Sequence, residues 1–235
     1  MRRLVLPSSI ENRQIILLVL LTSVSGVVDA ASYLSLGHVF TSNMTGNWVV
    51  LAFALGGAQV VDLLRLGLSF AGFVVGALIA GQLTRLRFGG ERRGWPTAVA
   101  AALMISVVVQ VTVLAIWFSD KDSPPATFLV FLLAVSMGSQ GGAVRELGVA
   151  DLPTVVITST VTGLTGDSFF GNGRSVRWRR RAAAVSAFFV GGLVGVLIGK
   201  IDEPLVLVGS LALLVGVLVA ARWFFAPVGP ANDPA

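Results

Sequence analysis

The chain alternates long apolar stretches with short polar ones. About 20 mainly apolar residues form a helix that crosses the roughly 30 Å of bilayer hydrocarbon. Six stretches meet this requirement, at 15–36, 63–84, 97–118, 126–147, 182–200 and 204–224. Two further apolar stretches, 41–57 and 154–170, are shorter and more polar. The pattern predicts an all-α polytopic transmembrane helix bundle with six crossing helices and two short or re-entrant helices.

The distribution of arginine decides how the two short stretches are interpreted. Basic loops stay on the cytoplasmic side, and this chain has two strongly basic loops, 85–93 and 174–181. If both short stretches crossed, three crossings would separate the loops and place them on opposite sides. If both return, the loops share one side with Arg2 and Arg3, so we expect both termini in the cytoplasm. A seven-span protein is the alternative, because about 17 residues is the lower limit for a span.

Composition places the chain in the membrane class. Hydrophobic residues make up 55% and charged residues 12%, with a mean hydropathy of +0.86. Soluble domains carry about 25% charged residues, so we predict one membrane domain, 1–235, whose partner is the lipid bilayer. The net charge of +5 lies in loops beside apolar spans, which favours lipid headgroups over nucleic acid. We expect the tail, 226–235, to be disordered.

A short polar sequence occurs twice. TSNMTGN at 41–47 matches TSTVTGL at 158–164, and the match pairs Thr41 with Thr158, Thr45 with Thr162 and Gly46 with Gly163. Just upstream, Leu36-Gly37 corresponds to Leu147-Gly148, and counting back from this pair places Asp29 opposite Gln140. A polar segment at corresponding positions of two halves indicates internal duplication.

Glycines extend the match. FAGFVVGALIAG at 70–81 resembles FVGGLVGVLIGK at 189–200, which aligns Gly72 with Gly191 and Gly76 with Gly195. The repeats then cover about 15–118 and 126–224. Three crossings in each half would invert the second copy, and inverted repeats with interrupted helices are a recurring transporter design. The four glycines are candidates for helix contacts, within the bundle or between protomers.

The physical reason for the polar heptapeptide is backbone hydrogen bonding. Irregular backbone at membrane depth survives only where protein or a wet cavity surrounds it. Serine, threonine and asparagine side chains can bond the freed backbone groups. Such segments can line a pathway, or they can only hold helices together, and the sequence leaves both interpretations open.

Two blocks resemble a known family. DAASYLSLGHVFTSNMTGN and MGSQGGAVRELGVADLPTVVITSTVTGLTGDS are similar to the YoaK-like family of bacterial inner-membrane proteins, which shares LGHVF-x-x-NMTGN and MG-x-Q…LGV-x-DL…T-x-TGL. Family members often have Asn-Ala after the glutamine, where this chain has Gly141 and Gly142. The resemblance implies a multi-pass protein of the bacterial inner membrane and names no substrate.

Three residues stand out as candidates for chemistry. Asp29 lies within the first span, and a carboxylate in hydrocarbon marks a functional site by default, although it could also cap the short helix. Gln140 occupies the matching position and can both donate and accept hydrogen bonds. His38, the one histidine, could relay protons or could simply face water at the end of the span.

The full set of candidate pathway residues combines these three with the two polar segments: Asp29, His38, Thr41, Asn43, Thr45, Gly46, Asn47, Gln140, Thr158, Thr160, Thr162 and Gly163. A lone histidine and no cysteine predict no metal site. The sequence holds no motif of a metalloprotease, serine hydrolase, nucleotide-binding loop or dinucleotide fold, so we expect neither an enzyme nor a cofactor.

These observations lead to a functional hypothesis and a rival. The hypothesis is a small secondary transporter or channel with a midplane site built from both threonine-glycine segments. Asp29 would bind a proton or cation, and the substrate would be a small molecule. The rival is a non-transporting structural or assembly protein whose polar segments only pack helices. A homo-oligomer is compatible with both.

Overall fold

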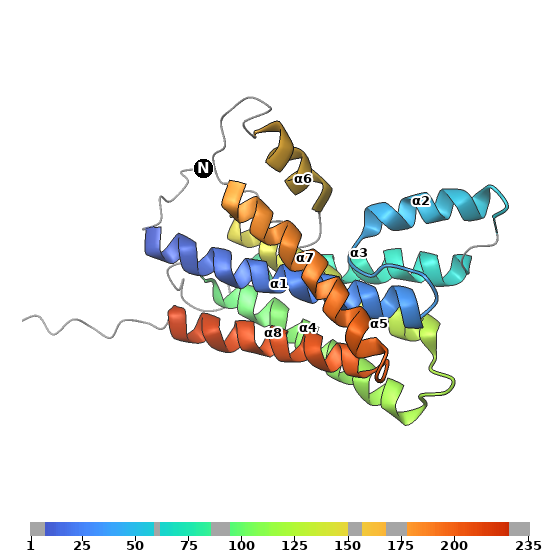
Figure 1. Cartoon of the computed structure of the whole chain (residues 1–235). Helices are drawn as coiled ribbons and strands as arrows, with labels where there is room; N and C mark the ends of the chain where they lie inside the picture. The colour runs from blue at the N-terminus through green and yellow to red at the C-terminus, as the bar shows by residue number, and fades with distance from the viewer. Residues whose placement is uncertain (1–7, 59–61, 86–94, 150–156, 168–177, 226–235) are drawn as a thin grey trace, which may run out of the picture.

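The computed structural model describes residues 8–58, 62–85, 95–149, 157–167 and 178–225. Within these ranges the regular elements are all helices (Figure 1). They are α1 (Ser8–Ser35), α2 (Met44–Leu55), α3 (Leu63–Arg85), α4 (Thr97–Ser119), α5 (Ala126–Leu147), α6 (Ile157–Gly166), α7 (Trp178–Gly199) and α8 (Leu205–Phe224). The tail that we expect to be disordered, 226–235, lies outside the described residues.

Helix length separates the spans from the short helices. Six helices, α1, α3, α4, α5, α7 and α8, are long and apolar enough to cross a membrane. α2 has 12 residues and α6 has 10. At about 1.5 Å of rise per residue, neither reaches across roughly 30 Å of hydrocarbon. The predicted all-α class, with six crossing and two short helices, is confirmed.

Polar contacts mark the two ends of the bundle. At one end, which we call the terminal side, Arg13 Nη1 donates to the carbonyl of Phe224 over 2.8 Å. Arg180 pairs there with Glu11, with 2.6 Å between Nη1 and Oε1. At the other end, the opposite side, Lys121 pairs with Asp202 over 2.6 Å. The starts of α1 and α7 and the end of α8 therefore share the terminal side.

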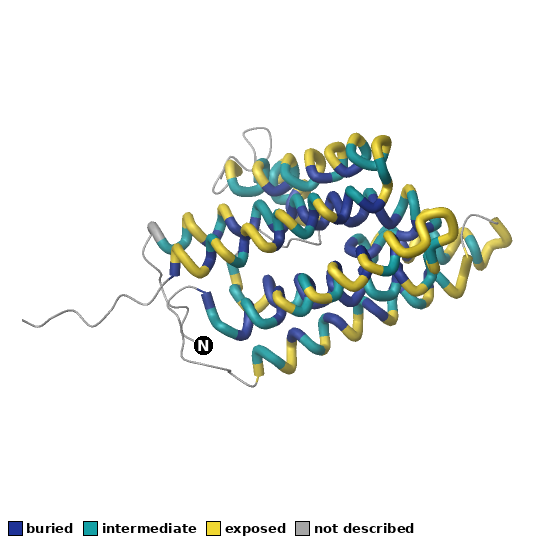
Figure 2. Tube along the Cα trace, turned by 90° about the horizontal axis from the view of Figure 1, so that it is seen from below, coloured by how far each residue is buried: buried dark blue, intermediate teal, exposed yellow. Residues whose placement is uncertain are grey.

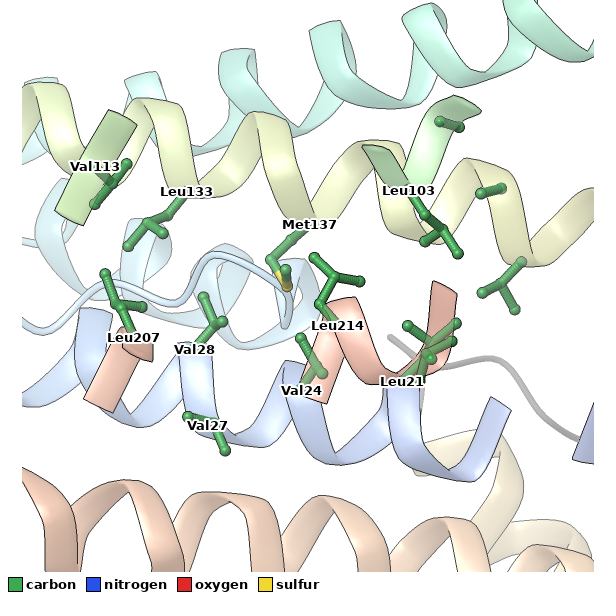
Figure 3. Packing of buried hydrophobic residues seen from close by; sticks show 14 of the residues in the cluster. Leu21, Val24, Val27, Val28, Leu103, Val113, Leu133, Met137, Leu207 and Leu214 are labelled. Atoms are coloured by element: carbon green, nitrogen blue, oxygen red, sulfur yellow. The ribbon is translucent and has the colours of Figure 1, made fainter. Parts of the chain in front are cut away.

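The centre of the bundle is formed by α1 and α5. In each, 67% of the most apolar stretch is buried, against 17% to 39% in the other four spans. Figure 2 shows how buried residues line the inner faces while exposed ones lie outside. Val24 and Val28 of α1 meet Met137 of α5 and Leu214 of α8 in the apolar core (Figure 3).

Glycines allow two pairs of helices to approach closely. A Cβ added at Gly76 of α3 would collide with the carbonyl oxygen of Val135 of α5, and one at Gly138 would collide with that of Phe73. Without a hydrophobic driving force between helices in lipid, such close backbone contact is a main source of association. Small residues therefore fix the α3–α5 contact.

The α1–α7 contact has the same construction. A Cβ at Gly191 would collide with the carbonyl oxygen of Ser23, and one at Gly26 with that of Phe188. Gly72 and Gly195 also lie at these two contacts, so all four glycines of the sequence alignment pack within the chain. In the structure, Gly76 and Gly191 hold similar positions, since each meets a carbonyl oxygen of a central helix, that of Val135 for Gly76 and that of Ser23 for Gly191. The sequence alignment instead pairs Gly76 with Gly195, which lies one helical turn further along α7. Glycine recurs at turn spacing along these helices, which makes a one-turn shift hard to detect from sequence.

Alanine substitution tests the α3–α5 contact. We expect Gly76→Ala to lower stability by about 1–3 kcal/mol, the usual effect of overpacking, and to lower the melting temperature of the purified protein. Gly81→Ala on the same helix is the matched control, because a Cβ there meets nothing within 4 Å. Equal melting temperatures for the two variants would contradict the close approach.

Candidate functional site

The segment after α1 folds back along that helix and is held by Asp29. Asp29 Oδ1 accepts the backbone amides of Thr41, at 3.0 Å, and Ser42, at 2.8 Å. Its Oδ2 accepts the hydroxyl of Ser42 at 2.6 Å. Asp29 lies about 9 Å below the end of α1, given 1.5 Å per residue, and is only 4% exposed. Residues 36–55 therefore form a re-entrant hairpin with the heptapeptide at its foot.

Asn47 ties the same hairpin to α3. Its Nδ2 donates to the carbonyl of Phe40 at 2.7 Å and to Ser69 Oγ at 3.2 Å. Its Oδ1 accepts the Phe40 amide at 3.0 Å, and Ser69 Oγ donates to the Phe40 carbonyl at 2.7 Å. Both backbone groups of Phe40 are thereby satisfied without a helix, as irregular backbone at membrane depth requires.

Two further residues of the heptapeptide have local roles. Asn43 caps α2, because its Oδ1 accepts the amide of Gly46 at 3.3 Å; this is the ordinary function of asparagine at that position. Thr45 is exposed on the outside of α2. The heptapeptide is thus mainly a set of hydrogen bonds that stabilises the turn.

His38 lies apart from the Asp29 network. It is exposed and has a left-handed backbone with φ of 60°. Its ring contacts Tyr33 edge to face, with centroids 5.2 Å apart. In the described part of the chain, no recorded contact links the ring to Asp29.

A row of buried polar residues continues along α1, which we call the polar row. Its members lie on one face of the helix and are at most 4% exposed: Gln14, Thr22, Ser25, Asp29 and Ser32. Gln140 of α5 faces this row and is fully buried. Its Nε2 donates to the carbonyl of Leu21 and to Ser25 Oγ, both at 3.0 Å. Its Oε1 is buried and has no partner among the described residues.

A second polar network links α4, α5 and α8. Gln110 Nε2 donates to Ser136 Oγ at 3.2 Å, and Ser210 Oγ donates to Gln110 Oε1 at 2.9 Å. All three residues are fully buried. Sequence reasoning missed them, although a glutamine within the span 97–118 was a signal, since polar side chains in spans face the bundle interior.

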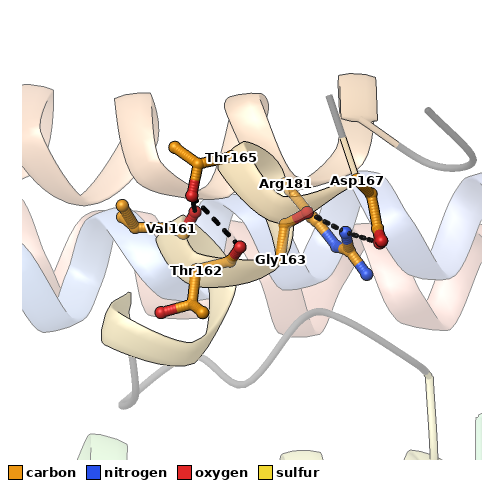
Figure 4. A network of polar contacts seen from close by, with 6 residues as sticks. All are labelled: Val161, Thr162, Gly163, Thr165, Asp167 and Arg181. Carbon is orange, nitrogen blue, oxygen red and sulfur yellow. Dashed lines mark hydrogen bonds and ion pairs between the residues drawn. The ribbon is translucent and has the colours of Figure 1, made fainter. Parts of the chain in front are cut away.

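The second threonine-glycine segment forms α6, which packs against α7. Arg181 of α7 binds the carbonyl of Gly163 and pairs with Asp167 Oδ2 at 2.6 Å (Figure 4). Thr160 is buried, whereas Thr158 and Thr162 are exposed. The Thr162 hydroxyl donates to the Thr158 carbonyl at 3.0 Å.

The two segments do not form one site in this structure. Among the described helices α2 contacts α3 alone and α6 contacts α7 alone, and the two short helices lie at opposite ends of the bundle (Figure 1). The expected meeting of both threonine-glycine segments in one midplane site is therefore not found in this structure. The reason is that each segment is held by its own neighbour while α1 and α5 fill the centre.

Two hollows on the bundle surface have linings that include neither segment. One, of about 600 Å³, lies between α1, α7 and α8; another lies between the start of α5 and α3. Both are lined almost entirely by apolar side chains, including Val27, Ile198 and Gly209 in the first and Leu68, Phe128 and Phe131 in the second. Such surfaces suit lipid chains, so the candidate site is the polar interior, from Asp29 to Gln140.

Six spans, a re-entrant hairpin and a buried polar interior define a class of protein: a polytopic α-helical integral membrane protein. Residues 17–221 match the family described as protein of unknown function (DUF1275). The chain is 32% identical over 213 residues to the UPF0700 transmembrane protein YoaK of Bacillus subtilis (strain 168), covering 88% of this chain and 93% of that protein. The chain therefore belongs to the YoaK-like DUF1275 family. No solved structure matches it significantly.

The exposed faces of α2 and α6 differ and can be compared by chemical labelling. α2 exposes apolar residues such as Val49 and Phe53, whereas α6 exposes Thr158 and Thr162. The chain has no cysteine, so single cysteines report on their own positions. In opened membranes, where both sides are accessible, we expect Thr158→Cys and Thr162→Cys to react with a membrane-impermeant thiol reagent, because hydroxyl side chains favour water over lipid. Val49→Cys and Phe53→Cys are the controls and should stay unreactive. Similar low reactivity at all four positions would place the α6 face against lipid.

Proposed function

We propose that this protein moves a small solute or ion across the membrane by exposing the polar interior between α1 and α5 to each side in turn. The observation that carries the proposal is Gln140, a fully buried side chain whose amide hydrogens are bonded to α1 while its oxygen has no partner among the described residues. A buried, unsatisfied acceptor costs about 1–3 kcal/mol. A bound substrate that donates a hydrogen bond would remove that cost.

An inverted repeat is part of the proposal, and the helix contacts support it. Exchanging α1–α4 with α5–α8 maps the contact of α3 with α5 onto that of α7 with α1. It likewise maps α4–α5 onto α8–α1 and α2–α3 onto α6–α7. The contacts α1–α5 and α4–α8 map onto themselves, so both would lie on the pseudo-twofold axis. Inverted-repeat transporters bind their substrates near such an axis.

Buried polar side chains form hydrogen bonds across both self-mapped contacts. Gln140 bonds Ser25 across α1–α5, and Gln110 bonds Ser210 across α4–α8. A protein whose polar residues served only the two short segments would have no need of them there. This placement favours a central site over the rim of the bundle.

The rival function, a non-transporting structural or assembly protein, is favoured by a different observation. Most polar groups of the heptapeptide already have hydrogen-bond partners, either within the hairpin or in Asp29 and Ser69. A protein that only needed a rigid hairpin would look the same at this position. The two functions therefore differ at Gln140 rather than at the heptapeptide.

Transport assays with Gln140 variants separate the two functions. Proteoliposomes containing the protein are screened with small neutral and cationic solutes, and Gln140→Leu is compared with the wild type. We expect the variant to insert and fold but to lose about ten- to a hundredfold in apparent affinity, since each 1.4 kcal/mol is about tenfold.

Thr112→Val is the control for this assay, because the Thr112 hydroxyl is exposed and bonds only the Val108 carbonyl of its own helix. Folding is checked by melting temperature. If no screened solute shows flux, or if the wild type and Gln140→Leu show equal flux, the structural role is favoured.

Orientation is also proposed here: a bacterial inner membrane with both termini in the cytoplasm. Support comes from the basic loops, 85–93 and 174–181, which the positive-inside rule places in the cytoplasm. We expect Ser123→Cys, on the opposite side, to be labelled from outside intact cells. Gln82→Cys, near the end of α3, should be labelled only after the membrane is opened. The reverse pattern would invert the orientation, and labelling of both positions from outside would contradict the span count.

A further inference from the structure

Asp29 is a buried carboxylate without a counter-charge. Among the described buried polar residues it is the one ionisable side chain. Its hydrogen-bond donors are the backbone amides of Thr41, Ser42 and Asn43 and the hydroxyl of Ser42, and no described ion pair includes it. An isolated charge in a low-dielectric interior is costly unless something neutralises it.

A basic side chain that packs against the turn, Arg65, forms its recorded hydrogen bond with another helix and not with Asp29. Arg65 of α3 packs against Gly37 in the turn that follows α1. Its Nε donates to Thr127 Oγ1 of α5 at 3.3 Å. No described arginine therefore pairs with the carboxylate at the foot of the hairpin.

Two residues whose amides bond this carboxylate, Thr41 and Ser42, also carry hydroxyl oxygens. Thr41 donates its amide to Asp29, yet its hydroxyl oxygen is buried and has no partner among the described residues. The Ser42 hydroxyl donates a hydrogen bond to Asp29 Oδ2, so the lone pairs of the Ser42 oxygen can still bind a ligand. The carboxylate of α1 and the two hydroxyl oxygens of the turn thus offer three hard oxygen ligands.

We propose that Asp29, Thr41 and Ser42 bind a monovalent metal cation. The inference rests on the proposed function, in which this ion would be coupled to solute movement. Oxygen ligands suit hard cations, and one carboxylate balances one positive charge. Divalent sites draw on several carboxylates, and no group of three acidic, histidine or cysteine side chains exists among the described residues.

Binding at this position would link the ion to the shape of the hairpin. Asp29 is on α1, whereas Thr41 and Ser42 belong to the re-entrant turn, so an ion held by all three joins the two segments. A ligand that binds one arrangement better than another shifts the equilibrium towards it. Cation binding therefore favours the hairpin docked on α1, and cation release favours its detachment.

Thermal unfolding of the full-length protein in detergent tests the site. Its five tryptophans provide the fluorescence signal, and NaCl, LiCl and KCl are each titrated against choline chloride at constant ionic strength. We expect a saturable rise in melting temperature with at least one metal cation and none with choline, because a ligand that binds only the folded state stabilises it.

Substitutions at Thr41 make the test specific. Thr41→Val should raise the half-saturating cation concentration about tenfold or more, and Thr41→Ser should restore it. Thr22→Val is the matched control, since this buried hydroxyl on α1 bonds the carbonyl of Leu18. If Thr41→Val does not fold, Ser42→Ala replaces it in the same titration.

The outcomes distinguish this inference from the transport function. A melting temperature that responds to choline as it does to metal cations, or to pH alone, would overturn the cation site. So would unchanged half-saturation in Thr41→Val or Ser42→Ala. Cation binding without flux of any solute would refute the transport function and leave the site standing. Solute flux with no cation effect would do the opposite.

Discussion

The arrangement of this protein depends on the need of every backbone group in hydrocarbon to find a hydrogen-bond partner. The chain breaks its helical pattern after Ser35 and returns into the bundle before α2 begins at Met44. The amides freed by that break are bonded by Asp29, and both backbone groups of Phe40 are bonded by Asn47. Without these two side chains the hairpin would have no stable place at membrane depth.

Close packing of the long helices determines where the hairpin can lie. Glycine contacts pull α3 onto α5 and α7 onto α1, so each half of the chain wraps around the central helix of the other. The centre is then filled by α1 and α5. The short helices therefore lie at the rim of the bundle. The polar residues in its centre are Ser25, Gln140, Gln110 and Ser210.

The sequence predicts the structure correctly where one property of a segment is enough to determine its secondary structure and place in the bundle. Hydropathy over some 20 residues is enough to find the six long helices, and the shorter apolar stretch of 41–57 is enough to predict a short helix there. Asp29 could be singled out because a carboxylate in a span is rare. Partners across helices were not accessible in this way: Gln140 meets Ser25 because α1 and α5 cross there, and no local pattern encodes that crossing. The one-turn difference in the pairing of Gly76 has the same origin.

The structural and the ion-binding interpretations of Asp29 are compatible. An arginine paired with Asp29 would neutralise the carboxylate permanently and leave the hairpin fixed. Amide and hydroxyl donors instead hold the carboxylate in place without cancelling its charge, so the cost of burial stays unless a mobile ion arrives. In the proposed cation site, the hydrogen bonds that stabilise the turn also make its stability depend on whether an ion is bound. A hairpin of this kind can be rigid when loaded and free to move when empty, as alternating access requires.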